Sequence, residues 1–468
     1  MEFKSVQKKS LDEVLDSYIF ELSKIKYLHF KKDDQIENIP KIEVVVHIID
    51  KIYYAALKGD WGIKITDDQV SIYNGTHWEI AEKETIKRFL GKAVVTLGYD
   101  LIKGRHHLFV QDLRNQFMGL SFNTSPLINT QLILVNMANG TLEIYENGDY
   151  HFRDFDKRDN LYYQLDFEFD PDAKTELFDK YLTRVLPDEK DRLILAEYCG
   201  YIFTKNSLLK LEKVLILLGN GNNGKSLFFE LLYSILGKHN ISTYGMSALT
   251  NENGYYRSQI QHKLLNYSSE LNEKFNSTMF KILSSGESTS ARSPYGKPFI
   301  IENYCRFMFN ANELPSDFEN NNAFFRRFII LNFDQTITEE EKDIQLASKI
   351  IATELPGIFV WILSGLRRLV TNKKFTYSLK SEKILTEYKE QSDPIQLMMN
   401  ELYYVPGVDH AIPLKESYEY FKNFCQESGF KLISIIKFSN RLKKLGFEIE
   451  RKSQGNVVYF SKVVQIDA

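Results

Sequence analysis

Apolar side chains near the N-terminus recur first at helical spacing and then at strand spacing. Between residues 11 and 25 they fall at every third or fourth position, behind an S-x-x-E capping box formed by Ser10 and Glu13. This pattern predicts an amphipathic helix that covers its own domain, although the same face could bind a partner. From about residue 63 apolar and polar positions alternate, which is typical of strands.

The alternating region contains two sets of predicted strands with a helical segment between them. Asn74-Gly75 separates two short alternating runs and predicts a hairpin with a two-residue turn. A second antiparallel meander is expected over residues 132–155, and apolar spacing predicts a helix over residues 83–97. We therefore expect an α+β N-terminal domain over residues 1–165.

The strongest motif lies between an apolar run of strand length and a helical pattern. The run covers residues 215–218, the helical pattern covers residues 227–236, and the loop between them reads G-x-x-x-x-G-K-S. This order predicts a phosphate-binding loop, because glycines let backbone N–H groups surround a phosphate at the start of a helix. The expected binding residues are Gly219, Asn220, Gly221, Asn222, Asn223, Gly224, Lys225 and Ser226.

ATP with Mg²⁺ is the cofactor pair that this loop predicts. Lys225 would reach the β- and γ-phosphates, and the Ser226 hydroxyl would hold Mg²⁺. Hydrolysis also needs a group that orients water, a polar sensor of the γ-phosphate and a cation for the developing charge. Three later strand patterns supply candidates, since one ends in Glu270, one ends in Asn312 and one follows Arg326 and Arg327.

Glu270, Asn312 and Arg327 fit the water-orienting, sensor and cation roles in that order, and Glu270 would also contact the metal. Five motifs follow one another along the chain, in the order G-x-G-x-N-G-K-S, S-E, S-G-E-x-x-x-A-R-x-x-Y-G-K-P-F, N-x-x-P and R-R-F. This series resembles the superfamily 3 helicases, in the branch of phage, plasmid and poxvirus-type primase–helicases. Residues 73–78, 139–142 and 169–173 resemble the domain that precedes the helicase in that branch, so the resemblance extends over about residues 63–333.

The resemblance implies an α/β fold with a P-loop AAA+-like ATPase core that assembles into a homo-oligomeric ring of six subunits. It also implies that Lys297, at the tip of a hairpin expected over residues 288–302, grips single-stranded DNA with Arg292 beside it. Two positions depart from the family pattern. Ser269 stands where many relatives have the first of two acids, and the adjacent Arg326 and Arg327 both fit the arginine finger, with the R-F spacing favouring Arg327.

The C-terminal pattern predicts a winged helix that binds DNA. Two helices are expected over residues 413–429 and 435–445, followed by a hairpin with a basic tip. Polar side chains of the second helix would contact base edges, and the tip would contact phosphates. A winged helix that contacts only protein is the alternative. The candidate DNA-binding residues are Lys437, Asn440, Arg441, Lys444, Arg451 and Lys452.

Composition sets limits on this picture. With 468 residues, 43% of them hydrophobic, the chain should fold into several globular domains. The net charge of −3 says nothing about nucleic acid, and three widely spaced cysteines argue against a zinc ribbon or a disulfide framework. No apolar run has membrane-spanning length, so we expect a soluble cytoplasmic protein without a membrane partner. The expected segments are 1–165, 166–210 as a helical connector, 211–372 as the ATPase, 373–412 as a helical linker and 413–468 as the winged helix.

Alternating carboxylates in the N-terminal part raise a further candidate site. Asp154 and Asp156 near His151, or the acids at 166, 168 and 170, could line one strand face and hold the metal of a primase. The same alternation describes an ordinary solvated face, and no further metal-ligand cluster accompanies it. The solvated face is the favoured interpretation.

Together these patterns predict an ATP-driven ring helicase that unwinds DNA and recognises the replication origin of a phage, plasmid or other mobile element. Its partners would be single- and double-stranded DNA, with a helicase loader or a polymerase as further candidates. One alternative is an ATP-switched, origin-binding initiator without motor activity. Another is a primase–helicase with primase activity in the N-terminal domain.

Overall fold

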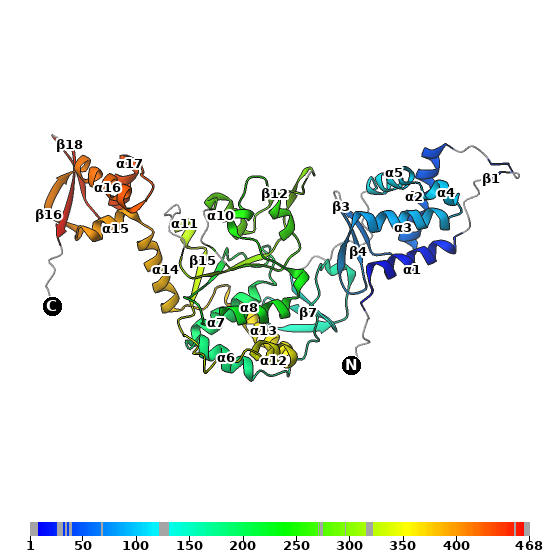
Figure 1. Ribbon diagram of the computed structural model, residues 1–468, viewed down its shortest axis with the longest axis horizontal. Coiled ribbons are helices and arrows are strands. Elements are labelled where there is room, and N and C mark those ends of the chain that lie inside the picture. Colours follow the sequence, from blue (N-terminus) through cyan, green and yellow to red (C-terminus); the bar gives the residue numbers. More distant parts are fainter. Residues whose placement is uncertain are drawn as a thin grey trace.

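The computed structural model describes residues 8–25, 31–32, 35–36, 40–66, 69–120, 131–269, 271, 275–294, 296–314, 322–453 and 455–462. A helical N-terminal region and a small C-terminal module lie at opposite ends of the long axis, and an α/β core lies between them (Figure 1). Among the described residues no single helix is long and apolar enough to span a membrane. The consecutive helices at 346–353 and 355–372 pass that test only as a pair, bent by 81°.

The N-terminal region folds around its own apolar core. Ser10 and Glu13 form the predicted capping box at the start of α1, and Val14, Leu15 and Leu22 of that helix are buried. The core joins the helices to a three-stranded antiparallel sheet of order β3-β4-β5. The elements are α1 (Leu11–Ser23), β1 (Lys31–Lys32), β2 (Gln35–Ile36), α2 (Lys41–Lys58), β3 (Ile63–Thr66), β4 (Gln69–Tyr73), β5 (Trp78–Ala81), α3 (Lys83–Thr96), α4 (Leu101–Arg105) and α5 (His107–Met118).

The hairpin between β4 and β5 is present, but its turn differs from the prediction. Tyr73 pairs with Trp78, so four residues connect the strands where two were expected. Asn74 explains the difference, because its Oδ1 accepts hydrogen bonds from the backbone N–H groups of Thr76 and His77, both at 2.9 Å. This side-chain turn replaces the tight Asn-Gly turn.

The second predicted meander is also present and belongs to a different core. It forms a sheet of order β6-β7-β8, and its apolar residues pack with the helices of the central region rather than with α1–α5. The segment then continues into two helices separated at Pro187, as expected. The elements are β6 (Ile133–Met137), β7 (Gly140–Ile144), β8 (Tyr150–Arg153), η1 (Lys157–Asp159), α6 (Leu177–Val185) and α7 (Glu189–Tyr201).

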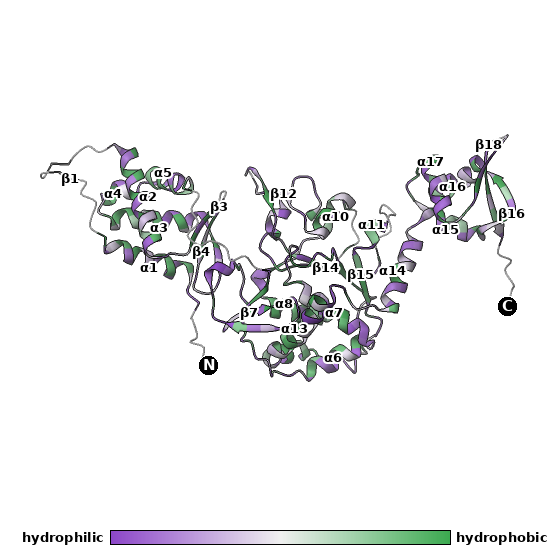
Figure 2. Cartoon of the chain, turned by 180° about the vertical axis from the view of Figure 1, so that it is seen from behind, coloured by the Kyte–Doolittle hydropathy of each residue, from purple (hydrophilic) through white to green (hydrophobic). Residues whose placement is uncertain are grey.

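A five-stranded sheet of order β10-β11-β14-β9-β15 forms the centre of the molecule, and each neighbouring pair is parallel. Figure 2 shows the apolar character of strands β14 and β15. Alternate residues of β9 point to opposite faces, so Leu215 and Leu217 pack with α7, α8 and α13 while Val214 and Ile216 pack with α9, α10 and α14. The predicted α/β class is confirmed, and its central sheet is parallel.

The elements of this central region run from β9 to α14. They are β9 (Val214–Leu218), α8 (Lys225–Leu236), η2 (Lys238–Asn240), β10 (Ile241–Ser242), α9 (Met246–Leu249), η3 (Tyr256–Ile260), β11 (Leu265–Ser268), α10 (Ser277–Ser285), β12 (Thr289–Arg292), β13 (Pro298–Ile301), β14 (Arg306–Ala311), α11 (Asn322–Phe325), β15 (Phe328–Asn332), α12 (Leu346–Thr353), α13 (Leu355–Asn372) and α14 (Leu379–Gln391).

The segment expected as a helical linker is divided between two cores. Leu385 and Tyr388 of α14 are buried in the central region, whereas Ile395, Met398 and Met399 are buried in the C-terminal module. That module is a three-stranded sheet of order β16-β18-β17 against three helices, and β16 was not predicted. Its elements are α15 (Pro394–Glu401), β16 (Tyr404–Pro413), α16 (Leu414–Ser428), α17 (Ile435–Lys444), β17 (Ile449–Lys452) and β18 (Gly455–Lys462).

Candidate functional site

The predicted phosphate loop connects β9 to α8 with a backbone that requires glycine. Gly219, Gly221 and Gly224 have φ of +156°, +97° and +86°, and Asn222 has φ of 46°. A Cβ at Gly219 would lie 2.5 Å from the Phe333 carbonyl oxygen, whereas one at Gly221 would meet no atom within 4 Å. The loop is therefore closely packed at its base and open at its crest, which is where an anion could approach the N-terminus of α8.

Lys225 is held by its own loop. Its Nζ donates to the Gly219 carbonyl and, at 3.1 Å, to Oδ1 of Asn223. Asn223 in turn donates from Nδ2 to the Phe333 carbonyl at 2.9 Å. The side chain is buried, and this burial lowers the pKa of the Lys225 ammonium. A bound phosphate would replace the oxygens that now accept from this ammonium.

A cavity of about 370 Å³ lies over the crest of the loop, between Lys225, Ser226 and the carboxyl ends of β11 and β14. Ser226, Ser269 and Asn312 are exposed to it, and Asn312 lies where the sensor was expected. Sequence analysis missed Asn310, whose Oδ1 accepts from the Tyr267 hydroxyl at 2.6 Å, leaving its NH₂ for the cavity. The alternation in Asn310-Ala311-Asn312 was the available signal, since it points both amides out of the strand in the same direction.

Two other segments brace the loop. The Ile337 N–H donates to the Asn222 carbonyl at 2.8 Å. Lys342 and Glu339 of the same segment both line the cavity and form an ion pair 3.3 Å apart. On the other side, the Tyr181 hydroxyl of α6 donates to the Gly224 carbonyl at 2.8 Å. A Cβ at Gly224 would lie 2.7 Å from Cγ1 of Val185, so α6 approaches too closely for any other residue there.

Ser226 and Glu270 are the two residues expected at the Mg²⁺ site. Glu270, predicted to orient water and to contact the metal, lies outside the described residues. The hydroxyl of Ser226 is free to reach a cation beside a bound phosphate. Among the described residues no group of three or more His, Cys, Asp or Glu side chains could hold a metal ion.

The two candidate finger arginines differ sharply in exposure. The Arg327 side chain is 8% exposed, donates from Nη2 to Ser285 at 2.8 Å, and lies 3.5 Å from the Glu212 carboxylate. The Arg326 side chain is 62% exposed and pairs with the same carboxylate at 2.7 Å. Arg327, which the sequence favoured as the arginine finger, is therefore buried and hydrogen-bonded within the chain. Arg326 is the arginine that is exposed to solvent.

Both arginines lie at the sheet edge opposite the phosphate loop. They precede Phe328, which is level with Val214, whereas the loop begins five residues later at Gly219. Five residues of strand correspond to roughly 16 Å at about 3.3 Å per residue. Neither arginine can therefore reach the loop of its own chain.

The β12–β13 hairpin carries the cations that the sequence assigned to it. Arg292 and Lys297 are both exposed, and Nε of Arg292 donates to the Gly296 carbonyl across the tip at 2.9 Å. Sequence analysis missed Arg257, a buried residue that donates to the Ser290 carbonyl at 2.9 Å and to the Leu249 carbonyl at 3.0 Å. Arg257 thus fastens β12 to α9 and fixes the base of the hairpin.

The C-terminal candidates are only partly available to a ligand. On α17 the side chains of Lys437, Asn440 and Lys444 are exposed, and on the β17–β18 hairpin Arg451 and Lys452 are exposed. Arg441 is not free, because its Nε and Nη2 both lie 2.6 Å from Oδ2 of Asp393, whose side chain is 3% exposed. Arg441 thus forms an ion pair that joins α17 to the N-cap of α15, and its expected base contact stays a prediction.

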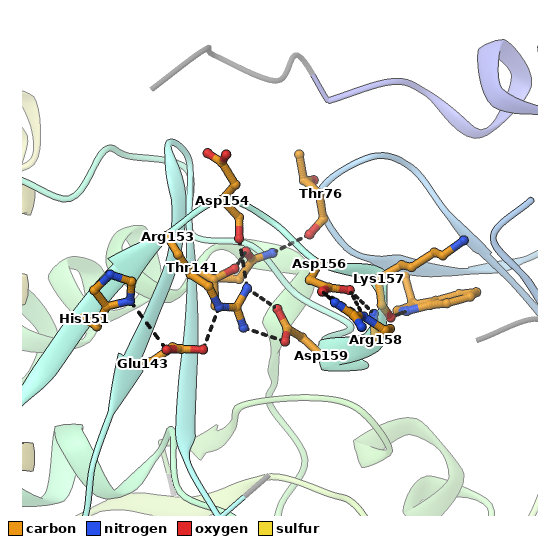
Figure 3. Close-up of polar contacts among 12 residues, drawn as sticks. Thr76, Thr141, Glu143, His151, Arg153, Asp154, Asp156, Lys157, Arg158 and Asp159 are labelled. Atoms are coloured by element: carbon orange, nitrogen blue, oxygen red, sulfur yellow. Dashed lines mark hydrogen bonds and ion pairs between the residues drawn. The ribbon is translucent and has the colours of Figure 1, made fainter. Parts of the chain in front are cut away.

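The carboxylates considered as a primase site are paired with arginines or solvated (Figure 3). Arg153 bonds Asp159 at 2.7 Å and Glu143 at 2.6 Å, and Asp156 pairs with Arg158 at 2.5 Å. His151 lies 3.6 Å from Glu143. The acids at 166, 168 and 170 are exposed in an extended segment outside any strand. The solvated interpretation thus fits the described residues.

Three family models match separate parts of the chain. A "D5 N terminal like" model matches residues 50–187, a "Poxvirus D5 protein-like" model matches residues 390–463, and a "Family of unknown function (DUF5906)" model matches residues 217–327. The last begins in β9 and ends at Arg327, so it spans the whole predicted nucleotide site. The two D5-type matches confirm the resemblance to the phage- and poxvirus-type primase–helicases.

One curated relative and two solved structures align with more of the chain than any single family model does. The protein named "Putative helicase 121R" of Invertebrate iridescent virus 3 is 22% identical over 355 residues, which are 67% of this chain and 37% of that protein. The chain therefore matches little more than a third of that relative's length. Two apo structures of the NrS-1 C-terminal region are 13% and 11% identical, with TM-scores of 0.46 and 0.44. They align with 88% and 90% of this chain and with 98% and 100% of theirs, and these scores are too low to establish a shared fold.

Proposed function

We propose that this chain is the ATP-driven helicase part of a replication protein of a virus, phage or other mobile element. It assembles into a ring, hydrolyses ATP between subunits and unwinds DNA. The observation that carries the proposal is the loop between β9 and α8, with an open crest, a buried ammonium and polar groups from β11 and β14 around one cavity. The D5-type matches on both sides of this loop support the same assignment.

The chain's own residues account for nucleotide binding in this proposal. Backbone N–H groups of residues 220–226 and the N-terminus of α8 receive the phosphates, and Lys225 exchanges its internal acceptors for phosphate oxygens. Mg²⁺, when bound, neutralises charge on the β- and γ-phosphates, and the Ser226 hydroxyl is the candidate ligand for it among the residues that the structure describes. Asn310 and Asn312 present amides to the γ-phosphate end of the cavity.

Assembly follows from the distance between the loop and the arginine pair. A cation is needed at the transferring phosphate, and the exposed Arg326 is on the wrong edge to supply it within one chain. It acts on the nucleotide of a neighbouring subunit. A repeated head-to-tail contact of this kind closes into a ring or continues as a filament.

DNA contacts are divided between two parts of the chain. Lys297 and Arg292 on the projecting β12–β13 hairpin follow the phosphates of a single strand within the ring. The C-terminal module is a winged helix in which α17 enters the major groove and the β17–β18 wing contacts phosphates. Lys437, Asn440 and Lys444 are the exposed candidates on α17, and this module gives the protein its preference for an origin.

Replacement of Lys225 tests the nucleotide site. Lys225→Ala should abolish phosphate release from ATP, because the alanine cannot neutralise the phosphates within the loop. The matched control is Lys190→Ala, at an exposed position on α7, which should hydrolyse ATP at the parental rate. Thermal melting of both variants checks that they fold. If Lys225→Ala hydrolyses ATP at the parental rate, the loop is not the site of ATP hydrolysis.

A further inference from the structure

A second cavity lies at the sheet edge opposite the phosphate loop. It has a volume of about 260 Å³, and its walls include Lys205, His262, Asn303 and Tyr162. Lys205 and His262 precede β9 and β11, and Asn303 lies between β13 and β14, just after the end of the β12–β13 hairpin. Because parallel strands begin at this edge and the phosphate loop follows the end of β9, the cavity is separate from the nucleotide site.

Two stacked rings form one wall of the cavity. Tyr162 and His262 have ring centroids 4.0 Å apart with planes inclined by 16°, and both residues are only partly buried. Lys64 lies 5.8 Å from the centre of the Tyr162 ring and 4.0 Å from that of Trp78. A planar base could extend this stack, because aromatic faces accept bases of any sequence.

His262 adopts a backbone conformation that non-glycine residues seldom take. Its φ is 59°, and its N–H donates to the Asn303 carbonyl at 3.0 Å, which ties it to the base of the hairpin. Asn160, which also lines the cavity, has φ of 55°. Such conformations cost free energy and are concentrated at binding sites. Burial, together with the charges of Lys64 and Lys263, lowers the pKa of His262 to about 4, so the ring is a neutral stacking surface near pH 7.

The third feature of the cavity is the ammonium group of Lys205, which differs from the neighbouring cations in its contacts. Arg306 at its base is fully engaged, with Nη1 2.5 Å from Oδ1 of Asn206 and Nη2 2.9 Å from the Thr204 carbonyl. Lys263 donates to the His239 carbonyl. Lys205, in contrast, is exposed, and its amine makes no hydrogen bond or ion pair with any residue that the structure describes. An ammonium beside a ring stack suits a nucleotide, with its base on the rings and its phosphate at the ammonium.

We propose that this cavity binds one nucleotide of an unpaired DNA strand, with the base against the Tyr162–His262 pair and the phosphate at Lys205. The inference rests on the proposed function, since the β12–β13 hairpin is there assigned to the same strand. A strand held by Lys297 and Arg292 at the tip passes the base of the hairpin as it leaves, and the cavity holds it there.

Strand binding by the full-length chain tests this inference without ATP. Fluorescence anisotropy with labelled oligo-dT should give about tenfold weaker binding for Tyr162→Leu than for the parent, from the loss of one stacked base. Tyr162→Phe keeps the ring and should bind within twofold of the parent. Lys205→Gln should reduce the slope of log affinity against log salt by about 0.7, the value expected for one phosphate of a single strand.

An abasic oligonucleotide shows whether Tyr162→Leu binds more weakly because a stacked base is lost or because the protein has lost its structure. On that ligand the parent and Tyr162→Leu should bind equally, because no base is present to stack. Equal binding of the two proteins to oligo-dT would overturn the inference, and so would a tenfold difference that persists on the abasic strand. Competition by free dTMP at the same nucleotide concentration as the oligonucleotide would also overturn it, since the site would then take free nucleotides.

The outcomes also distinguish this inference from the proposed function. If Tyr162→Leu binds oligo-dT like the parent while the parent hydrolyses ATP and unwinds DNA, only the cavity assignment fails. If the parent neither hydrolyses ATP nor unwinds DNA, the proposed function fails, and the anisotropy of parent and Tyr162→Leu still decides whether the cavity binds a strand.

Discussion

At the scale of single residues, the side chains around each arginine decide whether its guanidinium is exposed to a ligand or bound within the fold. Arg326 and Arg327 are equivalent in the sequence, and their different surroundings come from Glu212 and Ser285, which lie far from them along the chain. Arg441 lies on a polar helix face that predicts a free cation, but its guanidinium is paired with the Asp393 carboxylate. Ion pairs between distant segments leave no periodic signal, so sequence reasoning could not assign them.

Replacing Arg326 should affect catalysis, whereas replacing Arg327 should affect stability. Arg326→Ala should lower ATP hydrolysis by about three orders of magnitude, as for a lost arginine finger, without changing the melting temperature. Arg327→Ala should instead lower the free energy of unfolding by about 2 kcal/mol, because Glu212 and Ser285 lose a buried partner. Phosphate release and thermal melting measure the two effects. Mixing Arg326→Ala with Lys225→Ala should restore some hydrolysis, and a parental rate for Arg326→Ala alone would contradict its role.

Replacing Arg441 should also lower the stability of the protein. Arg441→Ala should destabilise the C-terminal module by about 3 kcal/mol, since it leaves the Asp393 carboxylate buried without its cation. Lys444→Ala is the matched control on the exposed face of α17 and should melt like the parent while binding duplex DNA more weakly. If Arg441→Ala keeps the parental melting temperature and loses only origin preference, the base contact first expected from the sequence is correct.

At the scale of elements, strong periodicity predicted most of the fold. The capping box of α1, the strand–loop–helix of β9 and α8, and both C-terminal helices lie where their patterns indicated. The misses have physical causes. Strand β16 contains Pro406 and Gly407 and is mostly exposed, so no apolar alternation marks it. The segment expected as a helical linker does contain two helices, α14 and α15, but their apolar residues are buried in two different cores.

The division of that linker predicts where the chain can be cut. Ending the chain at Ser392 removes the whole C-terminal core, and the remaining protein should keep its ATP hydrolysis on single strands while losing preference for origin duplex. Ending it at Ile412 should give an aggregation-prone protein, because Ile395, Met398 and Met399 would be exposed. Size-exclusion chromatography, phosphate release and duplex competition compare the two. Undiminished origin preference in the protein ending at Ser392 would move recognition to the N-terminal region.

At the scale of the whole molecule, the parallel sheet separates the proposed nucleotide site from the residues proposed to contact DNA. The phosphate loop follows the carboxyl end of β9, whereas Arg326, the base of the hairpin and the Tyr162–His262 cavity lie at the opposite edge. A neighbour's nucleotide would therefore be sensed at the edge that contacts the strand. The N-terminal helices and the C-terminal module extend from this core in opposite directions (Figure 1).

The most direct test of the central claim is strand displacement from a forked DNA duplex, measured together with ATP hydrolysis. The parent should release the strand with ATP and fail with a non-hydrolysable analogue. Lys297→Ala should keep basal hydrolysis and lose displacement, because the β12–β13 hairpin projects from the side of the core away from α8 (Figure 1). ATP hydrolysis by the parent without displacement of any strand would contradict the account and favour an ATP-switched initiator.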